Sequence, residues 1–432
     1  MRSNLLIVSL TCLALNTACV LDLPSTPAPD GVEPSPTATM GPEVTSTPTP
    51  PPTPVPLPET APVYFDSEAT IQTIAGSGEA GTEYSGDYWG YPLCSNTGDF
   101  GGDLGPATQA TLNWPTGVAV DDAGNVLVAE QCNWVIRAIS PEGIIRSMPG
   151  LAVYAYNGRA LYYALQGPGG VEVSARGNRY VVDTWSHVIF KLEAMGLNVA
   201  VAGTPYDLGY EGFEGETAPG YPALYTELFY PTGVAEDSMG RLYIANYVGA
   251  RILMVDEAGI VHELEMNTEF AGGLAIDAAD NLYVTDNDNH QLVKRSPEGV
   301  VTVLAGLRGE MGFTGDGGPA TEARLNWPSG VRVRADGLVF FTDTNNQRVR
   351  VIDTDGTLYT VAGNGARLAG SEYGDIGLFG GDGGPASAAS LNQPYALDFD
   401  KEGNLYIADA MNNRIRKVTF SAKGALRTSL RP

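Results

Sequence analysis

Short runs with a period of two dominate the chain from residue 115 onward. In one such run Leu405 and Ile407 alternate with Tyr406 and Ala408. A period of two is typical of a β-strand, because successive side chains point to opposite faces. Gly, Asn and Asp residues separate the runs and indicate turns between antiparallel strands. The pattern predicts an all-β body.

This body consists of one unit that is repeated. Each copy holds four short runs, exemplified by GVAV, NLYIAD, RIR and TLYTVAG. Four of the six copies span residues 115–150, 168–203, 328–363 and 394–420, and the third and fourth copies begin at residues 231 and 271. Four-stranded units that recur in this way are typical of the blades of a β-propeller. We therefore predict a six-bladed β-propeller.

The last copy ends near Phe420, before a fourth strand. Residues 69–76, ATIQTIAG, match the final run of other copies, such as TLYTVAG and VVTVLAG. We predict that this N-terminal strand completes the last blade and closes the ring. Closure removes the free edges that otherwise invite aggregation. The propeller is then a single domain, residues 65–420, followed by a C-terminal tail, residues 421–432.

The repeats resemble NHL repeats. The clearest copy is G-N-L-Y-I-A-D…N-x-R-I-R at residues 403–416. A second signature, FTGDGGPATEARLNWP at residues 313–328, recurs with changes at residues 379–394, 100–115 and 213–231. This insert resembles the one in teneurin-type NHL propellers and in secreted bacterial NHL proteins. The resemblance implies a domain that binds a protein, peptide or glycan. Some six-bladed relatives are metal-dependent lactonases or lyases, so the fold alone does not give the function.

The N-terminus resembles a bacterial lipoprotein signal peptide. In residues 1–19, Arg2 precedes an apolar run and small residues precede Cys19. The resemblance implies lipidation of Cys19, but Asn16 stands where the pattern prefers Leu, so ordinary secretion is the alternative. Residues 20–64 are rich in Pro and Thr and cannot form a core. We expect a disordered linker that tethers an extracytoplasmic propeller to a bacterial membrane through the lipid.

The net charge narrows the range of partners. The chain has 50 Asp and Glu against 25 Lys and Arg, which gives a formal charge of −25. Phosphate backbones would repel such a chain, so we expect no nucleic-acid partner. An anionic membrane surface would not attract it either. Divalent cations and basic partners remain open.

Aromatic residues are concentrated in the insertions around the first three copies. In antiparallel blades, the loops between blades share one face with the turns between second and third strands, and we call this the loop face. Tyr and Trp offer rigid contact area that suits sugars and polypeptides. The candidate ligand contacts are Tyr84, Trp89, Tyr91, Tyr156, Tyr163, Tyr210, Tyr221 and Tyr225. The alternative is that these rings pack the insertions against one another.

One residue ends the second strand of each copy, and five of the six are acidic: Glu130, Asp183, Asn246, Asp286, Asp343 and Asp409. Such a ring could hold Ca²⁺, which prefers oxygen ligands. No other cofactor is expected. If a metal binds, the candidate ligands are Asp183, Asp286, Asp343 and Asp409.

A structural role for these carboxylates is favoured over metal binding. An Asp at a strand end caps the following turn. It can also pair with the Arg five residues later, as in Asp343/Arg348 and Asp409/Arg414. A structural role is also favoured over metal binding for Asp316 in the insert. We expect it to cap a short helix that begins at Pro319.

Two cysteines remain after Cys12 leaves with the signal peptide and Cys19 is lipidated. Cys94 and Cys132 are both expected on the loop face in an oxidising compartment, so we predict a disulfide between them. No G-x-S-x-G or H-E-x-x-H motif occurs, and we predict a monomeric binding protein without catalytic residues. The alternatives are a Ca²⁺-dependent, gluconolactonase-like lactonase or lyase and a non-catalytic sensor or assembly scaffold.

Overall fold

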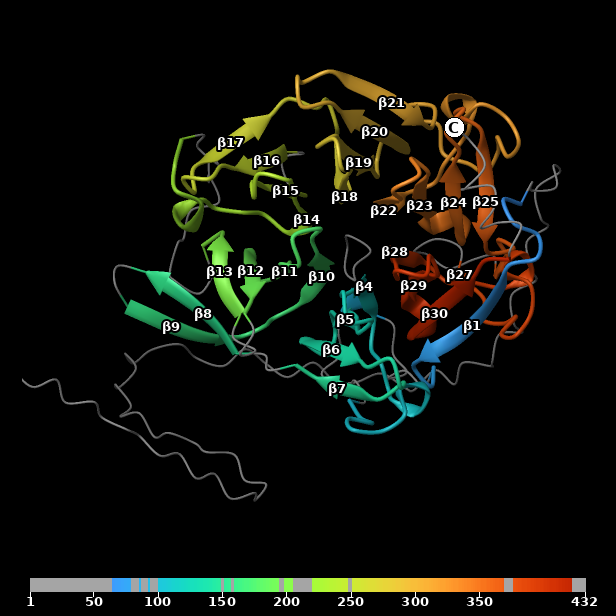
Figure 1. Cartoon of the computed structure of the whole chain (residues 1–432), viewed down its shortest axis with the longest axis horizontal. Coiled ribbons are helices and arrows are strands. Elements are labelled where there is room, and N and C mark those ends of the chain that lie inside the picture. Colours follow the sequence, from blue (N-terminus) through green and yellow to red (C-terminus); the bar gives the residue numbers. More distant parts are fainter. Residues whose placement is uncertain are drawn as a thin grey trace, which may run out of the picture. The chain divides into compact units, whose positions relative to one another are not determined.

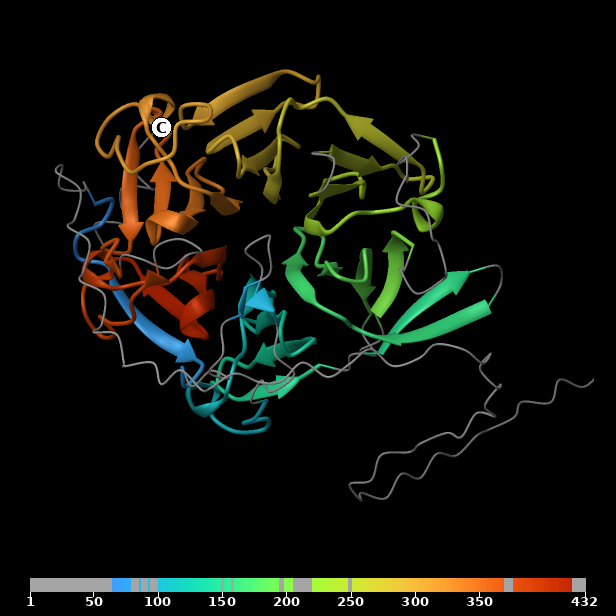
Figure 2. The same ribbon diagram turned by 180° about the vertical axis from the view of Figure 1, so that it is seen from behind.

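The computed structural model shows six four-stranded blades arranged in a ring (Figure 1). The structure describes residues 64–78, 85–86, 92–93, 100–148, 151–156, 159–193, 198–204, 220–247, 251–368 and 376–421. The first strand of each blade is nearest the centre of the ring and the fourth is at its periphery; Figure 2 shows the same arrangement from behind. The prediction of a six-bladed β-propeller is confirmed.

The strands of the first three blades pair in sequence order. Blade one contains β4 (Pro115–Val120), β5 (Val126–Glu130), β6 (Val135–Ile139) and β7 (Ile145–Ser147). Blade two contains β10 (Pro168–Val173), β11 (Arg179–Asp183), β12 (Val188–Leu192) and β13 (Asn198–Ala202). Blade three contains β14 (Pro231–Glu236), β15 (Leu242–Asn246), β16 (Arg251–Val255) and β17 (Val261–Leu264).

The last three blades follow the same plan. Blade four contains β18 (Ala271–Ile276), β19 (Leu282–Asp286), β20 (Gln291–Arg295) and β21 (Val301–Ala305). Blade five contains β22 (Pro328–Val333), β23 (Val339–Asp343), β24 (Arg348–Ile352) and β25 (Leu358–Ala362). Blade six contains β28 (Pro394–Phe399), β29 (Leu405–Asp409), β30 (Arg414–Thr419) and β1 (Thr70–Ala75).

Strand β1 closes the ring as predicted. It pairs antiparallel with β30, with Ile71 opposite Val418, and the register shifts once between Thr73 and Ala75. The first and last described parts of the chain therefore share one sheet. This pairing gives blade six its fourth strand.

Smaller elements lie between the blades. The hairpin of β8 (Leu151–Tyr156) and β9 (Arg159–Ala164) joins the sheet of blade two through β13. The pairs β2 (Ser85–Gly86) with β3 (Pro92–Leu93) and β26 (Arg367–Leu368) with β27 (Ile376–Gly377) are separate two-stranded sheets. Single 3₁₀ turns follow four insert prolines: η1 (Ala107–Gln109), η3 (Ala223–Tyr225), η4 (Ala320–Glu322) and η6 (Ala386–Ala388). Two more follow strands, η5 (Thr344–Asn346) and η7 (Ala410–Asn412). Within the described ranges, no helix has the length and hydropathy needed to cross a membrane.

The hydrophobic core is divided among the junctions between neighbouring blades. One cluster contains Leu127 of blade one and Val181 and Phe190 of blade two. Another contains Phe340 of blade five and Ile407 of blade six. The remaining clusters lie at the other four junctions. Each blade thus buries both of its faces, and closing the ring leaves no face uncovered.

Glycines let the first strands converge on the propeller axis. The third position of the first strand is Gly in five blades, for example Gly273 and Gly330. A Cβ atom added at Gly273 would lie 2.4 Å from the carbonyl oxygen of Ser329 in the next blade, and one at Gly330 would lie 2.6 Å from that of Tyr395. A larger residue would therefore push neighbouring blades apart at the axis.

Candidate binding site at the propeller axis

The residue that ends each second strand holds together the segment leading into its blade. In every blade its side chain accepts a hydrogen bond from the backbone N–H of the residue seventeen positions earlier. The six donor–acceptor pairs are Asn113–Glu130, Gln166–Asp183, Phe229–Asn246, Glu269–Asp286, Asn326–Asp343 and Asn392–Asp409. These side chains are all 0–1% exposed. Because the contact recurs in every blade, it belongs to the scaffold.

The acidic members also hold the following turn, as the sequence predicts for a strand-end carboxylate. Asn346 donates its side-chain N–H to Asp343 at 2.9 Å, and Asn412 does the same to Asp409 at 2.9 Å. Each candidate Ca²⁺ ligand is therefore occupied by donors of its own blade. In the described part of the chain, no group of three or more His, Cys, Asp and Glu side chains has the spacing to hold a metal ion.

The arginine partner of this carboxylate was predicted wrongly. Asp343 pairs with Arg350 at 3.2 Å and not with Arg348, five residues on. Arg348 donates instead to the carbonyl oxygens of Asn346 and Asn364 and stacks 3.7 Å from the ring centroid of Phe313. The reason is that the Asp343 carboxylate turns toward the segment before β22, where the Arg350 side chain crosses.

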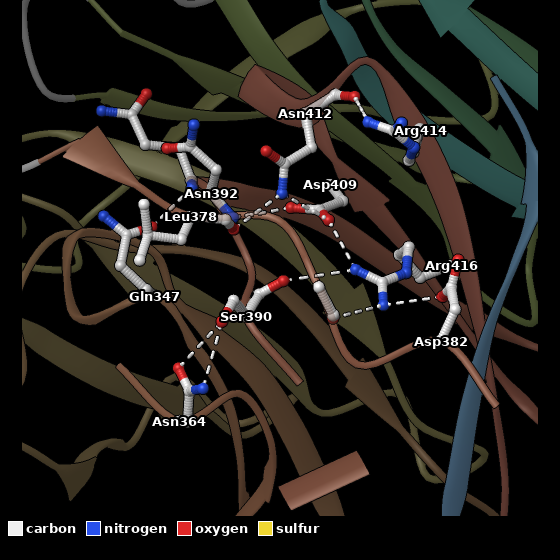
Figure 3. A network of polar contacts seen from close by, with 12 residues as sticks. Gln347, Asn364, Leu378, Asp382, Ser390, Asn392, Asp409, Asn412, Arg414 and Arg416 are labelled. Carbon is white, nitrogen blue, oxygen red and sulfur yellow. Dashed lines mark hydrogen bonds and ion pairs between the residues drawn. The ribbon is translucent and has the colours of Figure 1, made fainter. Parts of the chain in front are cut away.

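The same exchange of partners occurs in blade six (Figure 3). Asp409 pairs with Arg416 at 3.0 Å, whereas Arg414 donates to the carbonyl oxygen of Asn412. Arg416 also reaches Asp382 of the preceding insert at 2.9 Å. The guanidinium therefore ties the insert to the second strand of the blade.

The insert aspartates serve as the other partner of these arginines. Asp316 accepts from Arg350 at 2.6 Å and from the Thr360 hydroxyl at 2.6 Å. Contrary to our prediction, Asp316 does not cap η4. Pro319 holds the N-cap position, and no side chain caps that turn. Blade one repeats the arrangement with Arg137 between Asp103 and Glu130. The sequence signal was an Arg seven residues after the strand-end acid, present in those blades that also have the Gly-Asp insert.

Burial shifts the pKa of the strand-end acids. Burial raises the pKa of Glu130 to about 7, with Arg137 acting in the opposite direction. Burial raises the pKa of Asp183 to about 6, and there the opposing influences are hydrogen bonds from Ser186, Gln166 and Gly167 rather than an arginine. The arginine of blades one, five and six is thus replaced in blade two by neutral donors.

The inserts do not lie wholly on the loop face, contrary to expectation. The N–H of Ala320 donates to the carbonyl oxygen of Gly356 at 2.9 Å, and that of Ala223 to Gly259 at 2.8 Å. Both acceptors belong to turns between third and fourth strands, which lie on the opposite face. The middle of each insert therefore runs along the outer edge of a blade.

The predicted aromatic contacts that the structure describes lie at the periphery. Tyr221 and Tyr225 are 57% and 48% exposed in the insert beside β17. Tyr156 and Tyr163 belong to the β8–β9 hairpin, which extends the outer side of blade two (Figure 1). The other four candidates, Tyr84, Trp89, Tyr91 and Tyr210, lie outside the described residues. The role of this set in ligand binding stays a prediction.

One of the two cysteines expected to pair is described. Cys132 follows β5 in the turn between second and third strands and is disulfide-bonded. Cys94, together with Cys12 and Cys19, lies outside the described residues. The pairing of Cys132 with Cys94 stays a prediction, as does lipidation of Cys19.

A cavity of 300 Å³ lies on the propeller axis. The first strands of all six blades line it, together with residues that follow the second strands, such as Gln131 and Asn287. Most of its polar lining is uncharged backbone, hydroxyl or amide, and Trp327 and Tyr395 add aromatic rings. Its volume is at the lower end of the range for small-ligand sites.

Three charged side chains lie at the end of the cavity toward the face opposite the loop face, and we call them its floor; two of them, Arg332 and Glu172, line the cavity itself. They occupy the fifth position of three first strands, where the other three blades have Ala. Arg332 pairs with Glu172 and, at 3.1 Å, with Asp398, whose other oxygen accepts from the N–H of Val120 at 2.7 Å. Burial raises the pKa of Glu172 to about 7 against the lowering influence of Arg332. The floor therefore carries at most one net negative charge.

Two polar atoms of the cavity wall have no hydrogen-bond partner among the described residues. They are the hydroxyl oxygen of Thr116 and the side-chain carbonyl oxygen of Asn287. Both residues are buried, at 6% and 3% exposed. A buried polar atom without a partner costs free energy, so such atoms are rare and require an explanation. Both residues line the cavity.

Other hydroxyl groups near the axis already donate hydrogen bonds to backbone carbonyl oxygens of the next blade. Thr184 donates to the carbonyl oxygen of Pro231 at 2.8 Å, and Thr232 donates to that of Ala271 at 2.7 Å. Sequence reasoning missed this inner polar ring. The available signal was the second position of three first strands, where Thr116, Thr232 and Ser329 precede the axial glycine.

Comparison with known proteins agrees with the observed architecture. Residues 273–372 match the family model of the teneurin NHL domain. Teneurin-m of Drosophila melanogaster is 30% identical over 353 residues, which are 73% of this chain and 12% of that protein. Mouse teneurin-3 is 27% identical over 360 residues, which are 73% of this chain and 13% of that protein. The chain thus spans only a small part of the length of these curated relatives.

Solved structures share the fold at low sequence identity. An auxiliary nutrient binding protein from Bacteroides ovatus has a TM-score of 0.56 and 17% identity, covering 82% of this chain and 77% of that one. A protein of unknown function from Bacteroides thetaiotaomicron has a TM-score of 0.56 and 19% identity, covering 81% and 76%. At these identities the likeness concerns the fold alone.

Proposed function

This chain is an NHL-repeat β-propeller protein, and we propose that it is a binding protein whose axial cavity holds a small, uncharged, hydroxyl-rich group of a glycan. The observation that carries the proposal is the pair of buried, unpartnered oxygens of Thr116 and Asn287. The Asn287 carbonyl oxygen needs a donor, and the Thr116 hydroxyl can donate or accept. Sugar hydroxyls suit both atoms, because each hydroxyl can donate and accept a hydrogen bond.

The rest of the cavity supports a neutral ligand over an ionic one. Arg332 is neutralised by Glu172 and Asp398, so no net positive charge is left for an anion. The rings of Trp327 and Tyr395 line the same cavity and offer the apolar surface that the faces of sugar rings require.

The test is a glycan array with the full chain, followed by calorimetry with the best oligosaccharide. Thr116→Val and Asn287→Leu should each weaken binding about tenfold, because each removes one hydrogen bond to the ligand. Thr226→Val is the matched control, since its buried hydroxyl bonds to Pro222 at 3.2 Å in the peripheral insert. It should leave the affinity unchanged.

Two results would contradict the cavity as the site. One is binding that survives both cavity substitutions but is lost in the double variant Tyr221→Ala/Tyr225→Ala, which would move the site to the peripheral aromatic residues. The other is an array with no glycan ligand and a peptide array with clear ones, which would replace the glycan by a peptide partner.

Membrane tethering is a further part of the proposal. The lipoprotein-like signal ending at Cys19 and the Pro/Thr-rich segment 20–64 support a propeller carried outside the cytoplasm on a lipid anchor. Mass spectrometry of the N-terminal peptide from the expressed protein tests this. Cys19→Ser should abolish acylation and release the protein from membranes. If the wild-type protein carries no acyl group at Cys19, secretion without a lipid anchor is the remaining explanation.

A further inference from the structure

Inserts cover the outer edges of four blades in the same way. In each, one outer-strand residue uses both backbone groups to bond to the insert, donating through its N–H and accepting through its carbonyl oxygen over 2.7–3.1 Å. These residues are Ile145, Val261, Leu358 and Ile71. They are 0–1% exposed. In blade two, strand β8 covers the edge instead by pairing with β13 in parallel.

Blade four differs from the other five. Its first strand is preceded by residues 265–270 only, whereas residues 306–327 precede that of blade five. No segment of the described chain pairs with the outer edge of β21. Val301, which corresponds to Leu358, is 39% exposed, and Val300 and Val303 are 63% and 39% exposed. Figure 1 shows β21 at the periphery of the ring.

Such an edge combines two features that favour strand addition. Its outward backbone groups are open to another chain, and its side chains are apolar. An extended peptide that pairs with an exposed edge gains main-chain hydrogen bonds, and alternate side chains give specificity. In the other blades the backbone at this position already bonds to a neighbouring segment, through one outer-strand residue in four blades and through strand β8 in blade two.

The charges beside the edge indicate the chemistry of the occupant. Lys294 and Arg295 lie on β20 opposite Thr302 and Val301. Lys294 lies 5.3 Å from the ring centroid of Tyr283, and neither cation pairs with a carboxylate of the described residues. Two unneutralised cations beside the edge favour a segment with acidic side chains.

A second copy of this chain fits the edge less well. Pairing of β21 with its own counterpart would bring the same two cations of each copy to one junction. It would also join two chains that each carry a formal charge of −25. Both effects oppose association.

We propose that β21 is a docking strand for an extended, aliphatic and acidic segment of a partner protein, which pairs with Val301 and Val303 as a fifth strand of blade four. This site is independent of the axial cavity. The partner segment would occupy the place that inserts take in the other blades. The apolar side chains of the segment would cover the three exposed valines.

Hydrogen exchange of the full chain tests whether the edge is open. The backbone amides of Val301 and Val303 should exchange much faster than that of Leu358, which donates to Gly318 at 3.0 Å. Equal protection at Val301 and Leu358 would show that this chain already covers the edge. That result would overturn the proposal.

A labelled peptide of alternating Val and Glu then probes docking by fluorescence anisotropy. Val301→Pro removes the outward N–H and should weaken binding about tenfold, whereas Val301→Thr keeps the N–H and should retain it. Replacing Glu by Lys in the peptide should weaken binding severalfold. Absence of binding, or equal affinity of both peptides and both variants, would overturn the proposal.

Sedimentation of the full chain identifies the competing occupant. The proposal expects a monomer for both the wild type and Val301→Pro. A wild-type dimer that Val301→Pro converts to monomers would show that a second copy, and not a partner segment, fills the edge.

Discussion

Blades five and four have the same four strands but differ in what surrounds them. In blade five an insert covers the outer strand, and Arg350 links Asp316 of that insert to Asp343 at the end of β23. Blade four has no such insert, and Val293 occupies the position of Arg350. Its strand-end acid, Asp286, relies on Asn289 and on backbone N–H groups. The arginine therefore occurs with the inserts that carry an aspartate, in blades one, five and six, where it joins that aspartate to the strand-end acid.

The largest effect is expected from removing the arginine of blade five. Arg350→Met leaves the buried carboxylates of Asp343 and Asp316 without their cation, and this should lower the free energy of unfolding by about 3–5 kcal/mol. Urea unfolding measures the change. Arg348→Met on the same strand is the control. It should cost about 1–2 kcal/mol, since Arg348 donates only to backbone carbonyl groups. Equal losses in the two variants would contradict the assignment of Arg350 as the link.

The next effect compares the covered and the open outer strand directly. Leu358→Ala should lower the free energy of unfolding by about 2–5 kcal/mol, because Leu358 is fully buried under the insert. Val301→Ala at the corresponding position of blade four should cost less than about 1 kcal/mol, because Val301 is already 39% exposed and the truncation removes less buried surface. Thermal or urea unfolding of the two variants measures both losses in the free energy of unfolding. A large loss for Val301→Ala would mean that β21 is covered.

Blade two allows a third comparison, because its strand-end acid, Asp183, accepts hydrogen bonds from neutral donors and has no arginine partner among the described residues. Burial raises the pKa of Asp183 to about 6 in the fold, against an ordinary value of 3.8. Between these two values the unfolded chain is ionised and the folded chain keeps its proton. The free energy of unfolding must therefore fall as the pH rises through this window. The total contribution is about 2–3 kcal/mol, and it is fully developed above pH 6.

The variant Asp183→Asn isolates this contribution. Relative to the wild type, its free energy of unfolding should rise by about 2–3 kcal/mol between pH 4 and pH 7. Urea unfolding at four pH values across this range measures the difference. A difference that is independent of pH would show that Asp183 titrates alike in the folded and unfolded chains.

These comparisons also show what the sequence could and could not predict. The blade count and the closing strand followed from repetition, because residues 69–76 match the fourth run of other copies. The partner of Asp343 did not follow, because Arg348 and Arg350 both lie on the next strand, within seven residues of Asp343. The choice between them depends on where the insert carries Asp316. Likewise Thr116 and Asn287 belong to different blades, and only the closed ring brings both into one cavity.

The smallest expected effect concerns calcium, where blades with and without the arginine should respond alike. Each candidate ligand, Asp183, Asp286, Asp343 or Asp409, belongs to a different blade and accepts hydrogen bonds from its own neighbours. To bind, Ca²⁺ would have to displace these donors at each carboxylate. Addition of millimolar Ca²⁺ or of chelator should therefore leave the melting temperature of the full chain unchanged. A stabilisation by Ca²⁺ that Asp286→Asn and Asp343→Asn both abolish would instead support the lactonase or lyase alternative, because that enzyme needs these acids to share one ion.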